Sequence, residues 1–402
     1  MIPFSPPHID DKIIAEVTAA LKSGWITTGP RTKDFEKRIT AYCGNKNTIC
    51  LNSATAGLEI MLRWFGIGQG DEVILPAYTY SATANVIIHC GAKPVFVDVN
   101  ADDFNISISN IEKAITTKTK VIMPVDFGGF PCDYDEINAL AVKHQSLFNP
   151  NSKNQEILNR ILILSDSAHS FGATYKGKKC GSLTDVSVFS FHAVKNLTTA
   201  EGGAIALNLP EPFDNFEIYN YLCMLTLHGQ NKDALAKTQK GNWKYDIIEA
   251  GYKCNMTDLS AAIGLVEIER YDNDTQLKRK QIYEAYDLAL SADNRLQVPT
   301  HVTPYKNGCY HLYPLRIKGI TEQQRDAIMK EIFEYDVSVN VHFIPVPNTT
   351  FYKKLGYNMD NYPVTYDNFS REISLPIYYD LTMEEVQIVI SAVIKSLNKV
   401  LC

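Results

Sequence analysis

Short apolar runs recur along the first half of the chain, and the stretches between them have the composition of helices. The runs are TICL (48–51), EVILPA (72–77), KPVFVDV (93–99), KVIMPVDF (120–127), ILILSD (161–166), VSVFSF (186–191) and GAIALN (203–208). Alternation of this kind is typical of a mostly parallel sheet with helices on both faces. The sequence therefore predicts an α/β fold whose large domain has three layers, αβα.

From about residue 255 the pattern becomes helical. Residues 256–290 keep apolar side chains at three- and four-residue spacing, with Thr257 as an N-cap. Beyond them, 308–317 and 337–346 have the alternation of strands, and 382–397 has the period of a helix. We therefore expect a large domain over 1–255, followed over 256–402 by a connecting helix and a smaller α+β domain.

Two polar stretches receive no chemical role. QSLFNPNSKNQEILNR (145–160) is rich in Asn and reads as a surface excursion. GIGQGDE (66–72) follows a predicted helix and precedes a strand, the reverse of the order that a dinucleotide-binding fingerprint requires, so it reads as a plain loop. A G-x-x-x-x-G-K-[ST] motif is also absent from the sequence, which argues against a nucleotide-hydrolysing enzyme.

Polar side chains follow several of the predicted strands. Ligands of such sheets bind beyond the carboxyl ends of the strands. We expect the polar groups at these ends to meet at one edge of the sheet; they are Ser53, Tyr78 to Ser81, Asp98, Asp126, Asp166 and Ser190.

The segment LNSATAGLEIMLRW (51–64) is a candidate phosphate site, because a strand passes through small hydroxyl residues into a strong helix. The start of a helix offers unpaired N–H groups and a partial positive charge. Ser53 and Thr55 would add hydroxyl donors. Simple N-capping by one hydroxyl, with no anion bound, is the alternative.

Two further strand ends carry groups suited to a flat, nitrogen-containing ring. Tyr80 in PAYTYSATANVI could stack on such a ring, or simply pack, since the chain has 22 tyrosines. Asp166 in LSDSAHSFGA ends an apolar strand, where a carboxylate needs a cationic or hydrogen-bonding partner such as a protonated pyridine nitrogen. Capping of a following helix is the alternative for Asp166. His169 could brace the carboxylate or the ring, or be structural.

Lys195 in FSFHAVKNLTTAEGG (189–203) follows another apolar strand. A lysine amine attacks carbonyl groups only when it is neutral, and burial in a cleft lowers its pKa enough to allow this. An ordinary surface lysine is the alternative for an isolated residue. The neighbouring strand ends favour the nucleophile.

Composition narrows the classes of ligand. The 402 residues carry a net charge of −6, which argues against nucleic-acid binding, so we expect small-molecule substrates. No apolar run approaches the roughly 20 residues of a membrane-spanning helix, and the start MIPFSPPHID does not resemble a secretion signal, so we expect no membrane association and a cytoplasmic location. The nine cysteines and nine histidines are scattered, without C-x-x-C or H-E-x-x-H, which predicts reduced thiols and no metal.

Ordered blocks along nearly the whole chain resemble the nucleotide-sugar aminotransferases, a branch of the fold-type I pyridoxal-phosphate enzymes. The blocks are IPFSPP (2–7), SGWITTGP (23–30), NSATAG (52–57), SDSAHSFGA (165–173), SFHAVKN (190–196), AEGG (200–203), GYKCNMTD (251–258) and SLPIYYDLT (374–382). Within the family the chain is most similar to enzymes that aminate C4 of a UDP-linked 4-keto sugar, such as those that form 4-amino-4-deoxy-L-arabinose.

The resemblance implies a role for each matching residue. Lys195 matches the lysine that holds pyridoxal 5′-phosphate as a Schiff base, and Asp166 the aspartate that faces the pyridine nitrogen; we take both as catalytic. Tyr80 matches the stacking position, and His169 lies beside the ring. The phosphate-binding positions implied are Ser53, Thr55 and Ser190, with Ala54 between the first two.

The resemblance also implies a homodimer with shared active sites. The commoner family pattern at 251–258 is G-Y-N-Y-R, whereas this chain has GYKCN (251–255). The family segment reaches the partner subunit's cofactor phosphate, and we expect Asn255 rather than Lys253 to do so here. Trp25, Thr27 and His342 would line the substrate pocket by family position, or else pack or anchor loops.

The expected reaction is transfer of an amino group from glutamate to the keto sugar by a ping-pong mechanism, with the cofactor alternating between pyridoxal and pyridoxamine phosphate. Cell-surface polysaccharide biosynthesis, including that of lipopolysaccharide, is the expected context. A sugar dehydratase on the same scaffold has histidine in place of Lys195. A non-catalytic regulatory homologue is a second alternative, and a nucleotide-sugar oxidoreductase would need the dinucleotide fingerprint that GIGQGDE does not provide.

Overall fold

The seven strands expected between residues 48 and 208 form one sheet. A computed structural model describes residues 1–231 and 244–401 of the chain. The strand order is β1-β9-β8-β5-β4-β2-β3, and only β9 is antiparallel to its neighbours, which confirms a mostly parallel sheet in an α/β fold. The strands are β1 (Asn47–Leu51), β2 (Glu72–Pro76), β3 (Lys93–Val97), β4 (Thr119–Ile122), β5 (Leu162–Asp166), β8 (Val186–Ser190) and β9 (Gly203–Leu207).

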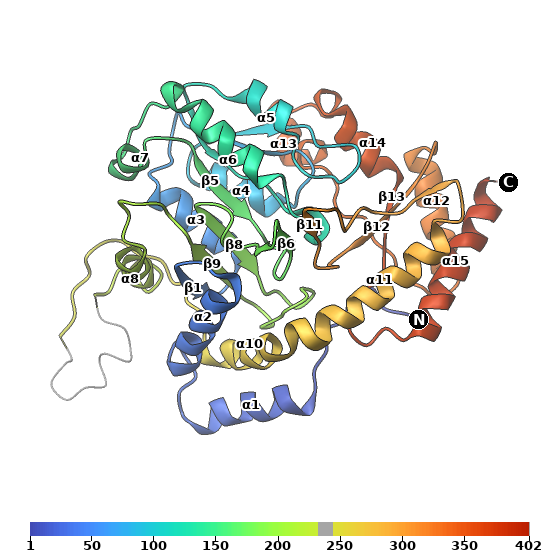
Figure 1. Cartoon of the computed structure of the whole chain (residues 1–402), viewed down its shortest axis with the longest axis horizontal. Helices are drawn as coiled ribbons and strands as arrows, with labels where there is room; N and C mark the ends of the chain where they lie inside the picture. The colour runs from blue at the N-terminus through green and yellow to red at the C-terminus, as the bar shows by residue number, and fades with distance from the viewer. Residues whose placement is uncertain (232–243, 402) are drawn as a thin grey trace.

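Helices connect these strands and surround the sheet (Figure 1). All residues of β2, β5 and β9 are buried, as expected for strands covered on both faces. The helices of this part are α1 (Asp11–Lys22), α2 (Pro30–Cys43), α3 (Ala54–Trp64), α4 (Ser81–His89), α5 (Ile108–Ala114), α6 (Tyr134–Lys143), α7 (Lys153–Leu158) and α8 (Asn215–Leu225).

One long helical run leads from the large sheet to the C-terminal part of the chain (Figure 1). It consists of α10 (Asp258–Arg270), a π-helical turn (Tyr271–Thr275) and α11 (Gln276–Leu290). The Thr257 hydroxyl accepts a hydrogen bond from the Ser260 N–H at 3.2 Å, so the expected N-cap is confirmed.

A second apolar core lies at the far end of this run, and Ile2 near the N-terminus is part of it. Its sheet has the order β10-β12-β13. The strands are β10 (Leu296–Gln297), β12 (Tyr313–Ile317) and β13 (Glu372–Leu375); the helices of this part are α12 (Glu322–Phe333), α13 (Thr350–Lys354), α14 (Pro363–Arg371) and α15 (Met383–Leu401).

The strand expected over residues 337–346 is wrong. Only isolated bridges form there, from Val337 to Ile2 and from Asn340 to Ser374. The segment is pinned to β13 at Asn340 and then turns away, because the rings of His342 and Phe343 pack against Phe4 and against other aromatic rings. The alternation of apolar residues in this segment therefore reflects the packing of its side chains, and the segment does not form the continuous backbone hydrogen bonds of a strand.

Short hairpin strands are also present that the periodicity did not predict: β6 (Thr174–Tyr175), β7 (Lys178–Lys179) and β11 (Lys306–Asn307). At two residues each they are too short to leave a periodic signal. They form a separate small sheet of order β11-β6-β7.

The polar stretch 145–160 is more than a surface excursion. It contains α7, which is capped by Ser152, and the side chain of Gln155 is buried. Gln155 Nε2 donates a hydrogen bond to the Phe65 carbonyl at 3.0 Å, so this stretch holds the end of α3 in place. GIGQGDE lies between α3 and β2, as expected of a loop.

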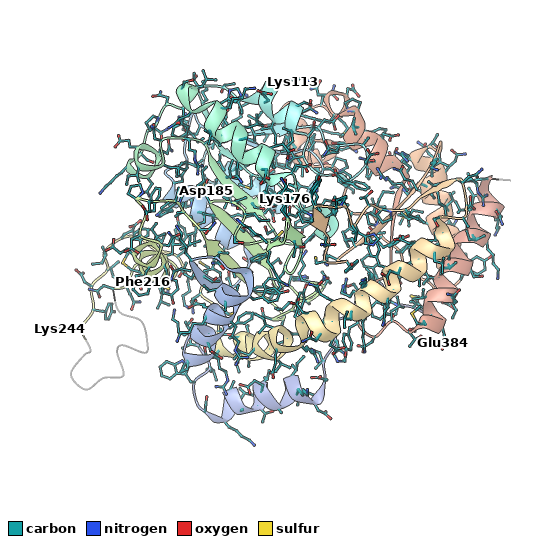
Figure 2. The ribbon with its side chains drawn as sticks, in the orientation of Figure 1. Lys113, Lys176, Asp185, Phe216, Lys244 and Glu384 are labelled. Atoms are coloured by element: carbon teal, nitrogen blue, oxygen red, sulfur yellow. The ribbon has the colours of Figure 1, made fainter. Side chains whose placement is uncertain are left out.

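Asp185, labelled in Figure 2, closes the amino-terminal edge of the large sheet. Its carboxylate makes two hydrogen bonds of 2.7 Å with the Arg160 guanidinium and accepts a third from the Ile163 N–H. The amino-terminal edge thus carries a paired carboxylate with a structural role, opposite the edge where ligands of such folds bind.

The structure also describes the cysteines, the groups that could bind a metal ion and the helices that could span a membrane. Cysteines 43, 50, 90, 132, 180, 223, 254 and 309, all within the described residues, are free thiols. Across 1–231 and 244–401, we find no group of three His, Cys, Asp or Glu side chains arranged to hold a metal ion. None of the helices described is long and apolar enough to cross a bilayer.

Candidate active site

Gly203 draws three chain segments together at the carboxyl edge of the large sheet. It pairs with Leu51 of β1 on one side and with Ser190 of β8 on the other. A Cβ atom at position 203 would lie 2.5 Å from the backbone nitrogen of Ala54 and from the carbonyl carbon of Ser53. Because glycine has no Cβ, β9 can approach the start of α3 this closely.

The start of α3 forms one side of the site. The Ser53 hydroxyl accepts a hydrogen bond from the Ala56 N–H at 3.2 Å, so Ser53 is the N-cap of α3. A cap satisfies only some of the free N–H groups of a first turn, and those of Ala54 and Thr55 remain donors for an anion. The Ser190 hydroxyl, across β9, accepts a weak bond from the His192 N–H at 3.4 Å.

Asp166 is buried at the end of β5. Its carboxylate accepts hydrogen bonds from the Thr83 hydroxyl at 2.7 Å and from the Ala168 N–H at 3.2 Å. Burial raises the pKa of Asp166, while these two bonds and the charge of Lys195 act in the opposite direction. No helix directly follows β5, so the alternative of a helix-capping role for Asp166 is wrong.

Lys195 lies in a turn just beyond β8, where its N–H donates to the His192 carbonyl at 2.9 Å. Burial lowers the pKa of the Lys195 amine to about 8, although the charge of Asp166 acts to raise it. The next residue, Asn196, donates through Nδ2 to the Cys309 carbonyl at 2.7 Å and so ties the turn to a distant segment. Lys195 is therefore no ordinary surface lysine.

His169 is a buried neutral ring beside this lysine. Burial lowers the pKa of His169 well below its usual value, and the charge of Lys195 adds to the effect. His169 Nδ1 accepts a hydrogen bond from the Gly128 N–H at 3.3 Å, which leaves the ring proton on Nε2. The His311 ring lies 4.4 Å away, centroid to centroid, and its Nδ1 pairs with Asn196 Oδ1 at 2.9 Å.

Tyr80 occupies the N-cap position of α4 and is 61% exposed. Its ring centroid lies 5.6 Å from that of Phe343, and the Phe343 ring lies 5.8 Å from His169. An exposed tyrosine face, a phenylalanine and a neutral histidine thus form an aromatic group next to Lys195 and Asp166.

The loop that carries Trp25 and Thr27 is anchored mainly to itself and to the start of α10. Trp25 Nε1 donates to the Thr28 carbonyl at 3.1 Å, and the Thr27 carbonyl accepts from the Asp258 N–H at 3.1 Å. The Asp258 carboxylate in turn caps α2 and accepts bonds from the N–H groups of Gly29, Arg31 and Thr32. The loop-anchoring alternative thus has direct support for Trp25 and Thr27.

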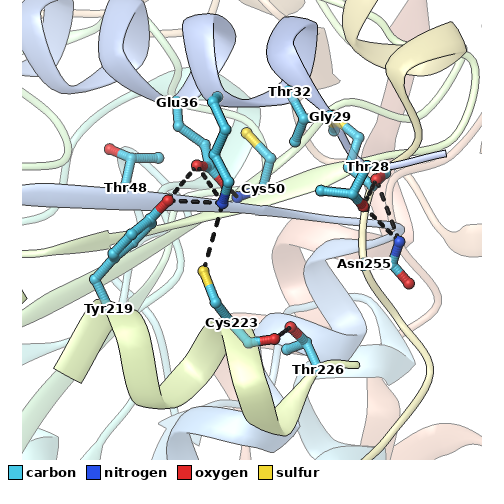
Figure 3. Close-up of polar contacts among 12 residues, drawn as sticks. Thr28, Gly29, Thr32, Glu36, Thr48, Cys50, Tyr219, Cys223, Thr226 and Asn255 are labelled. Atoms are coloured by element: carbon cyan, nitrogen blue, oxygen red, sulfur yellow. Dashed lines mark hydrogen bonds and ion pairs between the residues drawn. The ribbon is translucent and has the colours of Figure 1, made fainter. Parts of the chain in front are cut away.

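Asn255 and Lys253 belong to a segment that runs beside β1 (Figure 3). Asn255 Nδ2 donates to the Thr28 hydroxyl at 2.5 Å, and Lys253 Nζ donates to Asn255 Oδ1. Lys253 is exposed and Asn255 is half-buried. Within one chain both residues are therefore tied to the 25–28 loop.

His342 approaches the site from the C-terminal part of the chain. Burial, together with the charge of Lys195, lowers the pKa of His342 to about 4. Its Nδ1 lies 2.9 Å from the Ser374 hydroxyl. The structure thus brings His342, His169 and Asp166 into electrostatic contact with Lys195.

Several neighbours of the site carried no signal of their own in the sequence. Thr83 is the hydroxyl partner of Asp166, His311 and Phe343 flank His169, and Glu372 lies behind Ser374. Thr83 lies in the first turn of the helix that follows Tyr80. A hydroxyl residue at the start of a helix was the feature of the sequence that could have suggested a polar role for it. The others come from segments remote in sequence.

Comparison with known proteins agrees with this geometry. Residues 7–394 match the DegT/DnrJ/EryC1/StrS aminotransferase family. The chain is 38% identical over 402 residues to the spore coat polysaccharide biosynthesis protein SpsC of Bacillus subtilis, covering 98% of this chain and 96% of SpsC.

Solved structures of sugar aminotransferases are similar to this chain over the whole fold, and two such proteins serve as examples. One is the putative sugar aminotransferase Spr1654 of Streptococcus pneumoniae in its PMP form, with 47% identity, full coverage of both chains and a TM-score of 0.96; its PLP form gives 45% and 0.95. The other is Helicobacter pylori PseC, an aminotransferase involved in pseudoaminic acid biosynthesis, with 27% identity, 99% coverage of both chains and a TM-score of 0.88. The chain therefore belongs to the DegT/DnrJ/EryC1/StrS aminotransferase family and is a sugar aminotransferase that uses pyridoxal phosphate.

Proposed function

We propose that this enzyme moves an amino group from glutamate to C4 of a UDP-linked 4-keto sugar, in two half-reactions at one site, for polysaccharide biosynthesis. The observation that carries the proposal is that a lysine amine of lowered pKa and a buried carboxylate lie close enough at one sheet edge for the charge of each to act on the other. Support for the biological context comes from SpsC, which takes part in spore coat polysaccharide biosynthesis, and from PseC, which takes part in pseudoaminic acid biosynthesis.

The residues present fit pyridoxal phosphate. Burial raises the pKa of Asp166, and none of the described residues places a cation in direct contact with its carboxylate. A protonated ring nitrogen would supply that cation. The first turn of α3 offers N–H groups, and Ser53, Thr55 and Ser190 offer hydroxyls, for a phosphate. Tyr80 offers an exposed ring face for stacking, with His169 close by.

When bound, the cofactor supplies a carbonyl group for the amine and a conjugated ring that delocalises negative charge. Lys195 would hold it through its amine and, once freed, this amine would take up and return the proton of the substrate carbon. With a pKa of about 8, a useful fraction of the amine is neutral near pH 7. Asp166 would keep the ring nitrogen protonated, and the hydrogen bond from the Thr83 hydroxyl orients that carboxylate and favours its ionised form.

We further propose that the enzyme is a cytoplasmic homodimer in which Asn255 of one subunit serves the phosphate site of its partner. A dehydratase is the alternative reaction on this scaffold, and the presence of Lys195 argues against it. The large cofactor-binding domain would comprise 1–255, and the connecting helix with the small domain 256–402.

The first experiment tests the covalent role of Lys195. Borohydride reduction of the enzyme loaded with pyridoxal phosphate is expected to add the mass of the cofactor to the peptide that contains Lys195. Lys195→Ala is expected to lose this modification and to lower turnover by at least the ~10²–10⁴-fold of a positioned proton transfer. Lys176→Ala, at an exposed lysine paired with Asp135, is the matched control. Modification elsewhere, or near-normal turnover of Lys195→Ala, would refute the assignment.

The second experiment tests the substrates. UDP-, GDP- and dTDP-linked keto sugars are each incubated with glutamate, and product mass and the position of the new amine are determined. The proposal expects a UDP sugar aminated at C4. A product aminated at C3 would overturn that choice, and loss of water without amination would favour the dehydratase.

A further inference from the structure

Behind His342 lie two linked side chains, Ser374 and Glu372, that no role described above uses. The Ser374 hydroxyl lies 2.9 Å from His342 Nδ1 and 2.5 Å from Glu372 Oε1. The second carboxylate oxygen, Oε2, accepts the backbone N–H of His342 at 3.1 Å. Two backbone hydrogen bonds between Asn340 and Ser374, of 2.8 and 3.2 Å, hold the two segments in register.

The number of protons shared by Glu372, Ser374 and His342 decides which nitrogen of His342 carries hydrogen. A serine hydroxyl has one proton to donate and can accept another bond. When Glu372 is ionised, Ser374 donates to it, and His342 Nδ1–H must donate to Ser374. When Glu372 is protonated at Oε1, it donates to Ser374, and Ser374 donates to a bare His342 Nδ1, so that Nε2 carries the hydrogen.

The His342 ring itself stays neutral in both states. Burial and the nearby charge of Lys195 lower its pKa to about 4, so a change at Glu372 moves a proton from one ring nitrogen to the other without charging the ring. The charged or titratable groups that face His342 are Lys195, His169 and His311.

Glu372 is fully buried, and no cation within the described part of the chain is bonded directly to its carboxylate. Burial raises the pKa of Glu372 to about 8, although the bond from Ser374, the His342 N–H and the charges of Arg325 and Arg316 all act to lower it. Neither guanidinium is hydrogen-bonded to the Glu372 carboxylate in the described part of the chain. Arg316 donates to the Ala101 carbonyl and Arg325 to the Phe369 carbonyl, among other oxygens. Tyr78 is a further titratable group close to this carboxyl.

We infer that Glu372 sets the tautomer of His342 through Ser374, and that at neutral pH His342 presents an Nε2–H donor to an oxygen atom of the keto sugar. The sugar contact rests on the proposed function, whereas the tautomer switch does not. Glu372 and Ser374 are positioning residues, and His342 is a substrate-binding residue. Above pH 8 the same nitrogen becomes an acceptor and the contact is lost.

The switch is tested by NMR on the cofactor-loaded enzyme with ¹⁵N-labelled histidine. The signals of His342 are those missing from His342→Phe. Between pH 6 and pH 10 we expect the hydrogen to move from Nε2 to Nδ1, with a midpoint near 8. Glu372→Gln is expected to keep hydrogen on Nε2 throughout, because its amide NH₂ replaces the acid O–H as donor to Ser374. Ser374→Ala is expected to abolish the pH dependence, whereas Ser370→Ala, whose hydroxyl bonds to the Asp367 carbonyl, retains it.

A tautomer that does not change with pH in the natural enzyme, or that changes equally in Ser374→Ala, would overturn the switch. The sugar contact has a separate readout. Ser374→Ala is expected to raise KM for the UDP-4-keto sugar about 5- to 10-fold, in line with the loss of one well-placed hydrogen bond, and to leave the half-reaction with glutamate unchanged. An equal effect on both half-reactions would overturn the contact. Because the NMR measurement needs no turnover, failure of the proposed function and failure of the switch are distinguishable.

Discussion

The Thr83 hydroxyl donates the shorter of the two hydrogen bonds described above to the buried carboxylate of Asp166. A hydroxyl donor favours the ionised form of a carboxyl group and so lowers its pKa. Thr83 also lies 2.8 Å from the Thr79 hydroxyl, which completes the chain of hydroxyls at the start of α4. The state of the carboxylate thus depends on a residue that does not itself approach the reacting atoms.

Thr83→Val is therefore expected to raise the pKa of Asp166 and to lower kcat/KM about tenfold or more. A hydrogen bond to a charged group contributes about 1.5–3 kcal/mol, and about 1.4 kcal/mol corresponds to a factor of ten. Steady-state kinetics with both substrates measures the effect. Thr83→Ser keeps the hydroxyl and is expected to stay close to the natural enzyme; a similar loss in both variants would contradict the assignment.

The lowered pKa of Lys195 predicts how the rate of cofactor uptake depends on pH. Only the neutral amine attacks an aldehyde, so the rate at which the cofactor-free enzyme takes up pyridoxal phosphate is expected to rise with pH and to level off above about 8. Absorbance changes after mixing at pH 6 to 10 give the profile. A midpoint near the ordinary lysine value of 10.5 would show that burial does not act on this amine.

At the scale of elements, the strands of the large sheet could be predicted because each has enough apolar residues to leave a pattern. The polar residues at their ends followed from the parallel arrangement, and Asp166 and Lys195 do lie at one edge. The alternation of apolar residues over 337–346 led to the wrong prediction of a strand, because aromatic side chains that pack against neighbouring segments produce the same sequence pattern as a strand. Thr83, Glu372 and Ser374 act through contacts between segments far apart in sequence, which periodicity does not report.

The buried carboxylate of Glu36 connects helix α2 to its surroundings through the polar contacts drawn in Figure 3. The Glu36 carboxylate accepts bonds from Lys33 Nζ at 3.2 Å, from the Tyr219 hydroxyl at 2.7 Å and from the Cys50 N–H at 3.0 Å. These contacts join α2 to β1 and α8. Burial raises the pKa of Glu36, so its ionised form depends on these three donors.

Glu36→Ala is expected to lower the free energy of unfolding by about 3–5 kcal/mol, because it leaves Lys33 without its carboxylate partner in a largely buried position. Asp34→Asn, on the same helix, breaks an exposed pair with Arg38 and is expected to cost at most about 1 kcal/mol. Urea unfolding of the two variants gives the comparison. Equal losses would mean that the Glu36 network contributes no more than a surface pair.

Considered as a whole molecule, one chain leaves large apolar side chains exposed around the candidate site. Ile26, Tyr80, Val194 and Ile344 are each between 40% and 61% exposed. All four lie in or next to segments that form the site. A second copy of the chain, covering this region, would remove that apolar surface from water, in line with the proposed dimer.

Shared sites predict complementation between two inactive variants. Lys195→Ala and Asn255→Ala dimers, each nearly inactive alone, are expected to regain activity when they are unfolded together and refolded as mixed dimers. One of the two sites in a mixed dimer then combines an intact Lys195 with an intact Asn255. Sedimentation checks that the refolded protein is a dimer. Lys195→Ala refolded with Asp166→Asn is the control, because each site takes both Lys195 and Asp166 from one subunit, so that no site in that mixed dimer is intact. No recovery would place Asn255 outside the partner's site.

The close contact of β9 with the start of α3 bears on how such an enzyme can be redirected to other sugars. A methyl group on residue 203 would displace the turn at Ser53 and Ala54, so that position offers no room for new shape. In the single chain the side chains of Ile26 and Thr27 in the 25–28 loop are exposed, so substitutions there displace none of the chain's own atoms. Laboratory evolution toward a different sugar is therefore expected to accumulate changes in that loop and to leave the glycine untouched.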